Sequence, residues 1–262
     1  MSSKNISLRN TTVFVVGGSA GIGRGIADAL VKADARVVVL SRTPPKNTLE
    51  FTHLALEWRQ LDLSRPEESR IQLMAALNEF GSQLDAVFYS AVYYGAKRAP
   101  FLAVTEEEWQ QQLNVNLNGL WLSLSLTLPF LKKRTPSLFV HLSSEVVYNA
   151  GPYRSGYAAT KAAASNLISS LAQEDVSEQV RLVQLLPAKM VDTPGIRSRR
   201  ADDFDYSDYM SPKHFQSAAI KLIQTRGKGM HGKSWVVNEQ AQLQHIMQAT
   251  PISQSYQNHE AK

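Results

Sequence analysis

Short apolar runs alternate along the chain with longer stretches of helical periodicity, and this order restricts the possible folds more than any other feature. The runs are apolar nearly throughout, which is typical of strands covered on both faces of a parallel sheet. Strand followed by helix, repeated, predicts a doubly wound α/β fold. The predicted strands are Thr12–Val16, Arg36–Leu40, Leu84–Tyr89, Leu138–Leu142, Arg181–Leu186 and Ser234–Val237. The predicted helices are Ile22–Ala33, Pro66–Phe80, Glu106–Leu131, Gly156–Val176 and Pro212–Gln224.

Length and composition predict one domain and exclude several kinds of chemistry. A chain of 262 residues that is 44% hydrophobic fits a single domain, here 1–239, followed by a polar C-terminal tail, 240–262. Cysteine is absent, which excludes disulfides, thiolate metal sites and a cysteine nucleophile, and we expect no metal. The apolar runs are too short for a signal peptide or a membrane span, so we expect a cytoplasmic protein without a membrane partner. The net charge of +5 fits an anionic small molecule, and we expect no nucleic-acid partner.

A glycine-rich turn follows the first predicted strand and leads directly into a helix. It reads Gly17-Gly18-Ser19-Ala20-Gly21-Ile22-Gly23. Gly17 permits a tight turn, Gly21 lets the backbone approach a pyrophosphate, and Gly23 lets helix and strand pack closely. The free amides at the helix N-terminus suit phosphate groups. The pattern therefore predicts a Rossmann-type dinucleotide site formed by Gly17, Ser19, Ala20, Gly21, Ile22 and Gly23, and an ordinary glycine-rich turn is the alternative.

The end of the second predicted strand indicates which dinucleotide binds. An acidic residue at this place would hydrogen-bond the ribose hydroxyls and repel a 2′-phosphate. The chain has Ser41 and Arg42 there, and a guanidinium can hold a phosphate by charge-assisted hydrogen bonds. We therefore expect NADP(H), while the alternative is a solvated surface arginine.

Four polar residues further along the chain form a candidate catalytic group. Tyr157 and Lys161 lie one helical turn apart on one face of a predicted helix. Ser144 follows the fourth strand in the set above, and Asn116 lies within the long predicted helix. A free tyrosine has a pKa of about 10, and a nearby ammonium favours the phenolate. We therefore expect Lys161 to lower the pKa of Tyr157.

With these motifs in this order, the chain resembles the classical short-chain dehydrogenase/reductase family from about Asn10 to Val237. The resemblance implies an NADP(H)-dependent oxidoreductase that moves a hydride between nicotinamide and a carbonyl or alcohol carbon. In this family's pattern, Tyr157 transfers the proton, Ser144 donates to the substrate oxygen, and Lys161 hydrogen-bonds the nicotinamide ribose. Asn116 would bend its helix and hold a water. Further cofactor contacts are implied for Asp62, Leu63, Ser90, Ala91, Pro187, Ala188 and Met190.

Three segments depart from the family pattern. The family usually has Asn-Asn-Ala-Gly where this chain has Tyr89-Ser90-Ala91-Val92, and valine in place of glycine narrows the space for backbone and ligand. Ala188 replaces a glycine, and Val237-Asn238-Glu239 replaces an aspartate-glycine ending. These departures keep a second hypothesis open, namely a catalytically silent protein that binds NADP(H) and reports its redox state to a partner.

The substrate side of the predicted cleft is rich in aromatic residues. Tyr93, Tyr94, Glu145, Tyr148, Tyr153 and Met190 are its candidate lining residues. They favour a bulky or aromatic substrate, unless the rings only pack the rim. The polar segment from Pro194 to Pro212 resembles the family's lid, and its arginines either hold an anionic group or form a solvated loop with compensating aspartates. The resemblance also implies a homodimer or homotetramer built on the two long helices.

Overall fold

The computed structural model describes residues 7–46, 56–174 and 179–246. Within them lies an eight-stranded sheet in the order β3-β2-β1-β4-β5-β6-β7-β8. All neighbouring strands are parallel except β7 and β8. The strands are β1 (Thr12–Val16), β2 (Arg36–Ser41), β3 (Leu56–Gln60), β4 (Leu84–Tyr89), β5 (Ser137–Leu142), β6 (Val180–Pro187), β7 (Ser234–Val237) and β8 (Leu243–His245).

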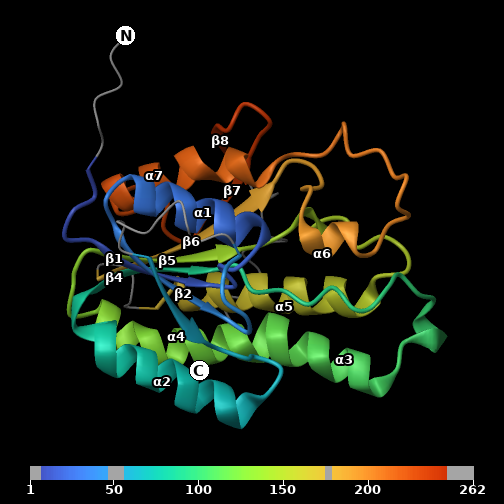
Figure 1. Cartoon of the computed structure of the whole chain (residues 1–262), viewed down its shortest axis with the longest axis horizontal. Helices are drawn as coiled ribbons and strands as arrows, with labels where there is room; N and C mark the ends of the chain where they lie inside the picture. The colour runs from blue at the N-terminus through green and yellow to red at the C-terminus, as the bar shows by residue number, and fades with distance from the viewer. Residues whose placement is uncertain (1–6, 47–55, 175–178, 247–262) are drawn as a thin grey trace, which may run out of the picture.

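Helices cover both faces of this sheet (Figure 1). On one face lie α1 (Gly21–Lys32) and α7 (Phe215–Thr225), and on the other lie α2 (Pro66–Phe80), α4 (Gly119–Leu131) and α5 (Ser155–Leu171). Successive residues of β1 enter different cores, since Val13 and Val15 pack with α1 and α7 while Phe14 and Val16 pack with α2 and α4. This two-sided burial explains why the strands read as continuous apolar runs, and it confirms the predicted single-domain doubly wound α/β fold.

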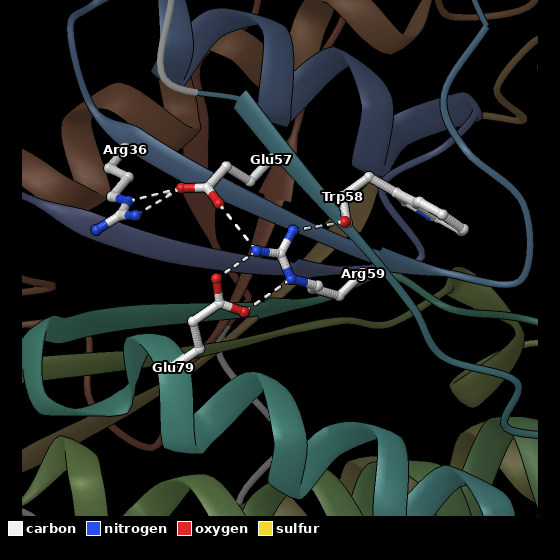
Figure 2. A network of polar contacts seen from close by, with 5 residues as sticks. All are labelled: Arg36, Glu57, Trp58, Arg59 and Glu79. Carbon is white, nitrogen blue, oxygen red and sulfur yellow. Dashed lines mark hydrogen bonds and ion pairs between the residues drawn. The ribbon is translucent and has the colours of Figure 1, made fainter.

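The edge strand β3 is absent from the predicted set of strands. Its sequence, Leu-Glu-Trp-Arg-Gln, has no apolar run, because an edge strand is covered less completely. A charged network holds it instead (Figure 2). Arg36 on β2 donates to Glu57 at 2.9 and 2.7 Å, and Arg59 donates to Glu57 at 3.2 Å and to Glu79 on α2 at 2.8 Å.

The long predicted helix Glu106–Leu131 is not continuous. The structure has α3 (Glu106–Leu113), a π-helical turn (Asn114–Asn118) and then α4. Asn116, for which the family resemblance implied a local bend, lies in this π-helical turn. The helix predicted from Gly156 ends at Leu171, and the one predicted from Pro212 begins as a 3-10 turn before α7.

The sheet extends further toward the C-terminus than the expected domain limit at residue 239. β8 pairs with β7 through Trp235 and His245, so part of the expected polar tail belongs to the sheet, and residues 247–262 lie outside the described residues. No helix in the described ranges has the length and apolar character to cross a bilayer. Among the same residues, no group of three or more histidine, aspartate or glutamate side chains is placed to hold a metal ion.

Candidate cofactor site and active site

A cavity of about 500 Å³ lies at the carboxyl ends of the central strands, where ligands bind in open α/β sheets. It brings together residues that are distant in sequence. The short helix α6 (Pro194–Arg197) lies beside it, beyond the carboxyl ends of the strands (Figure 1). The predicted cofactor residues that line it are Gly17, Ser19, Ala20, Gly21, Ile22, Ser41, Arg42, Asp62, Leu63, Ser90, Ala91, Tyr157 and Lys161.

The glycine turn closes tightly around its neighbours. Gly17 has a φ of +80°, and a Cβ at this position would lie 2.5 Å from the amide nitrogen of Ala91. A Cβ on Gly23 would lie 2.4 Å from the carbonyl oxygen of Gly17, so Gly23 packs beneath the turn instead of lining the cavity. The N-cap residue of α1, Ala20, makes no side-chain cap, which leaves the first amides of the helix available to an anion. The turn therefore fits the pyrophosphate of a dinucleotide.

The unusual segment after β4 leaves this cavity in place. Ser90, Ala91 and Val92 line it, so valine in the family's glycine position narrows the cavity without closing it. Tyr89 points away, into the core, where it is completely buried. Its hydroxyl donates to the main-chain carbonyl of Val115 in the π-helical turn. Tyr89 therefore makes a polar contact with the π-helical turn from a position where the family usually has asparagine.

Ser41 and Arg42 differ in whether their side-chain donors are available to hydrogen-bond a phosphate. The Ser41 hydroxyl is buried, donates to the carbonyl of Thr43 at 2.8 Å and accepts from the indole of Trp58 at 3.1 Å. The single hydrogen-bond donor of this hydroxyl, and one of its acceptor positions, are therefore occupied by other groups of the protein. Arg42 is exposed at the cavity. Of the two, only Arg42 has donors available for a 2′-phosphate.

Tyr157 and Lys161 reach the same cavity from α5. The Lys161 ammonium is buried and donates to the carbonyl of Leu142 at 2.7 Å, and burial lowers its pKa to about 8. The pKa of Tyr157 lies well above 10, because burial and then the nearby Tyr94 raise it, while the neighbouring Ser144 hydroxyl lowers it in part. The expected lowering of the Tyr157 pKa by Lys161 is therefore wrong for this structure, in which burial has the larger effect.

Asn116 and Ser144 lie behind the cavity wall and do not line it. The Asn116 amide oxygen accepts from the backbone amide of Tyr93 at 2.8 Å, and its nitrogen donates to the Tyr93 carbonyl at 2.9 Å and to the Thr160 hydroxyl at 3.0 Å. It therefore clamps the segment after β4 to α5. The Ser144 hydroxyl donates to Glu145 at 2.7 Å, and Arg154 pairs with that carboxylate at 3.1 Å.

Several predicted ligand contacts are not lining residues of this cavity. The nicotinamide-side candidates Pro187, Ala188 and Met190 lie outside it, at the end of β6 and just beyond. Of the candidate substrate residues, Tyr93 and Tyr94 line it, whereas Glu145, Tyr148 and Tyr153 do not. Tyr148 and Tyr153 are 51% and 58% exposed, so these two residues belong to the surface of the molecule.

The structure adds lining residues that the motifs did not indicate. Thr193 caps α6, accepting from the amide of Ile196, and its methyl group would lie 3.2 Å from a Cβ on Gly21. Pro194, Gly195, Ser198 and Arg199 line the same side. A Thr-Pro pair is a helix-start signal that could have been recognised in the sequence, but its closeness to the glycine turn depends on the fold.

Known proteins share both the sequence pattern and the fold. A family model described as short chain dehydrogenase matches residues 11–203. The chain belongs to the short-chain dehydrogenase family. This dehydrogenase is 29% identical over 218 residues to the short chain dehydrogenase/reductase AacuD of Aspergillus aculeatus, covering 80% of this chain and 75% of the relative. It is 30% identical over 205 residues to a 2-dehydro-3-deoxy-D-gluconate 5-dehydrogenase of Bacillus subtilis, covering 75% and 77%.

A solved structure supports the same assignment. A 3-oxoacyl (acyl-carrier-protein) reductase from Agrobacterium tumefaciens C58, with NADP bound, matches this dehydrogenase with a TM-score of 0.79 and 26% identity. The match covers 91% of this chain and 97% of that one. The chain is therefore an NAD(P)-dependent oxidoreductase of the short-chain dehydrogenase family, acting on a small molecule.

Proposed function

We propose that this dehydrogenase uses NADP(H) to interconvert a carbonyl compound and an alcohol, with Tyr157 as the proton donor or acceptor. The observation that carries the proposal is the meeting of two groups in one cavity. The glycine turn at Gly17 and the pair of Tyr157 and Lys161 come from segments about 140 residues apart, yet they line the same space. A dinucleotide held by the turn would place its reactive ring within the reach of this pair.

The protein groups suit the reduction of a carbonyl. When bound, the nicotinamide supplies the hydride. Because burial keeps the pKa of Tyr157 above 10, its phenol stays protonated near neutral pH and can give its proton to the carbonyl oxygen. Ser144 would donate a second hydrogen bond to that oxygen after release from Glu145. Lys161, which lines the cavity, would hold the cofactor ribose, and Asn116 would fix the backbone of Tyr93.

The preference for NADP(H) rests on Arg42. Its guanidinium is exposed at the end of β2, where a 2′-phosphate would be bound, and the cavity there also includes Ser41 and Thr43. The related reductase of Agrobacterium tumefaciens was solved with NADP.

By its resemblance to the family, we also expect the chain to assemble into homodimers or homotetramers.

One observation favours the alternative of a catalytically silent sensor. The hydroxyl of Ser144 is turned to Glu145, and Ser144 does not line the cavity. A protein that only bound NADP(H) would not need this hydroxyl to be free.

Cofactor titration followed by single-turnover kinetics separates these hypotheses. NADPH and NADH are first titrated into the protein while the fluorescence of its four tryptophans is followed, and we expect NADPH to bind more tightly. Oxidation of bound NADPH is then followed at saturating concentrations of a panel of ketones and aldehydes, for the wild type and for Tyr157→Phe. We expect about a 100-fold or greater loss of rate in the variant, with unchanged NADPH affinity. Tight NADPH binding with no oxidation by any panel member would favour the sensor, and absence of binding would reject both.

A further inference from the structure

Arg199 stands next to the proposed proton donor. It follows α6, lines the cavity and is half-buried. Its guanidinium lies over the ring of Tyr94, 5.5 Å from the centroid, and the Tyr94 ring lies 5.0 Å from that of Tyr157. A single aromatic ring therefore separates a cation from the phenol that we propose as the acid. A group bound by Arg199 would be held within the length of a small substrate from Tyr157.

The positive charge of Arg199 is not balanced by any carboxylate of its own segment among the described residues. No carboxylate in the described part of the chain lies within 4.0 Å of the Arg199 guanidinium, and its Nε is buried with no hydrogen-bond partner among the described residues. The neighbouring Arg197 does have a partner, since it pairs with Asp192 at 2.6 Å. The four aspartates expected to balance the arginines are all exposed, at Asp202, Asp203, Asp205 and Asp208.

Other cations increase the positive charge around this position. Arg98 and Arg200 are close enough to lower the pKa of Arg199, after the larger effect of burial, and the carboxylate that acts in the opposite direction is Glu108. Arg200 donates to the hydroxyl of Tyr209 at 3.2 Å, and its own Nε also lacks a partner among the described residues. Several guanidinium groups close together at a half-buried position repel one another, and a bound anion would relieve this repulsion.

We propose that the substrate carries a carboxylate or phosphate group, which Arg199 binds while the reacting carbon lies at Tyr157. A planar guanidinium matches both anions with paired hydrogen bonds, and its cation–π contact with Tyr94 favours its place beside Tyr157. This inference rests on the proposed function, because it names the substrate class of the same site.

The anionic groups of the cofactor have other places in the cavity. The open N-terminus of α1 suits the pyrophosphate, and Arg42 at the end of β2 suits a 2′-phosphate. Arg199 lies instead beside Tyr94 and Tyr157. It is therefore on the side where the substrate must react.

Binding of three small probes tests the inference without any turnover. Benzoate, phenyl phosphate and neutral benzamide are titrated calorimetrically into the full-length protein, with and without saturating NADP⁺. The same titrations are made with Arg199→Gln, which keeps a long side chain but removes the charge, with Arg199→Lys, and with the control Arg197→Gln. Thermal melting and NADPH titration of every variant check folding and cofactor binding.

We expect one or both anions to bind at least about tenfold more tightly than benzamide, and Arg199→Gln to abolish this difference. Arg199→Lys should keep part of it, and Arg197→Gln should keep all of it. Equal binding of the three probes, or an unchanged anion preference in Arg199→Gln, would overturn the inference. So would a loss of NADPH affinity in place of anion affinity, because Arg199 would then belong to the cofactor site. Failure of the wild type to oxidise NADPH would reject the proposed function alone, because the probe titrations do not depend on hydride transfer.

Discussion

The hydroxyl oxygen of Tyr89 occupies the space that a side chain on Gly119 would need, since a Cβ there would lie 2.7 Å from it. That hydroxyl donates to the carbonyl of Val115, so it joins β4 to the π-helical turn before α4. The turn also carries Asn116, which clamps the cavity segment at Tyr93. A residue that departs from the family pattern is thus part of the support of the proposed active site.

Replacement of Tyr89 by phenylalanine should lower the free energy of unfolding by about 1 kcal/mol, because the hydrogen bond from the hydroxyl of the buried Tyr89 to the Val115 carbonyl is lost. Urea denaturation measures this change. Tyr148→Phe is the matched control, since Tyr148 is 51% exposed, and its effect should stay below about 0.5 kcal/mol. Equal effects of the two substitutions would contradict the structural role of Tyr89.

Gly119→Ala should destabilise the protein by about 1–3 kcal/mol through overpacking, although alanine is otherwise the better helix former. The clash of the alanine methyl group with the Tyr89 hydroxyl outweighs the gain in helix propensity, so the net effect is a lower free energy of unfolding. In a Tyr89→Phe background the same alanine should cost less, because the oxygen is gone. A double-mutant cycle of unfolding free energies measures the coupling, and strict additivity would show that the two residues do not meet as described.

Arg42→Ala should weaken NADPH binding by about tenfold and leave NADH binding unchanged, since it removes a charge-assisted hydrogen bond to the 2′-phosphate. Ser41→Ala should change the NADPH affinity by less than about threefold, because its hydroxyl already bonds to Thr43 and Trp58. Fluorescence titration gives both affinities. A similar loss for NADPH and NADH in Arg42→Ala would mean that the residue supports the fold of the site.

Lys161 should make the stability of the cofactor-free protein depend on alkaline pH. Burial lowers its folded-state pKa to about 8, from the ordinary 10.5, so between these values the unfolded chain binds more protons than the folded one. The free energy of unfolding of the wild type should therefore rise relative to Lys161→Met by about 1–3 kcal/mol from pH 8 to pH 10.5. Denaturation curves across this range measure the difference, and a flat or falling difference would place the ammonium in contact with solvent.

The sequence was sufficient for the features in which local chemistry and tertiary structure agree. β1 and β4 are buried on both faces, and their apolar runs coincide with the observed strands. The glycine turn could be recognised because only glycine permits the approach of Ala91 to Gly17. The helix over Pro66–Phe80 begins with proline and acidic residues, which are strong start signals.

The remaining features depend on contacts between distant segments. β3 has too few apolar residues to resemble a strand, and its place at the edge is held by Arg36 and Glu79 from other elements. The pKa of Tyr157 depends on how completely α5 buries it, which spacing along a helix does not reveal. The difference between Arg199 and Arg197 depends on which of the two meets Asp192.

The segment that carries Arg199 leaves and rejoins the rest of the protein at one point. Val191 and Met210 form a parallel bridge, and the amide of Asp192 donates to the carbonyl of Met210 at 2.8 Å. Because its two ends are fixed side by side, insertions, deletions or exchanges between them need not move any strand of the sheet. Given the role that we propose for Arg199, exchanges within this one segment would change substrate preference without moving the strands that carry the glycine turn.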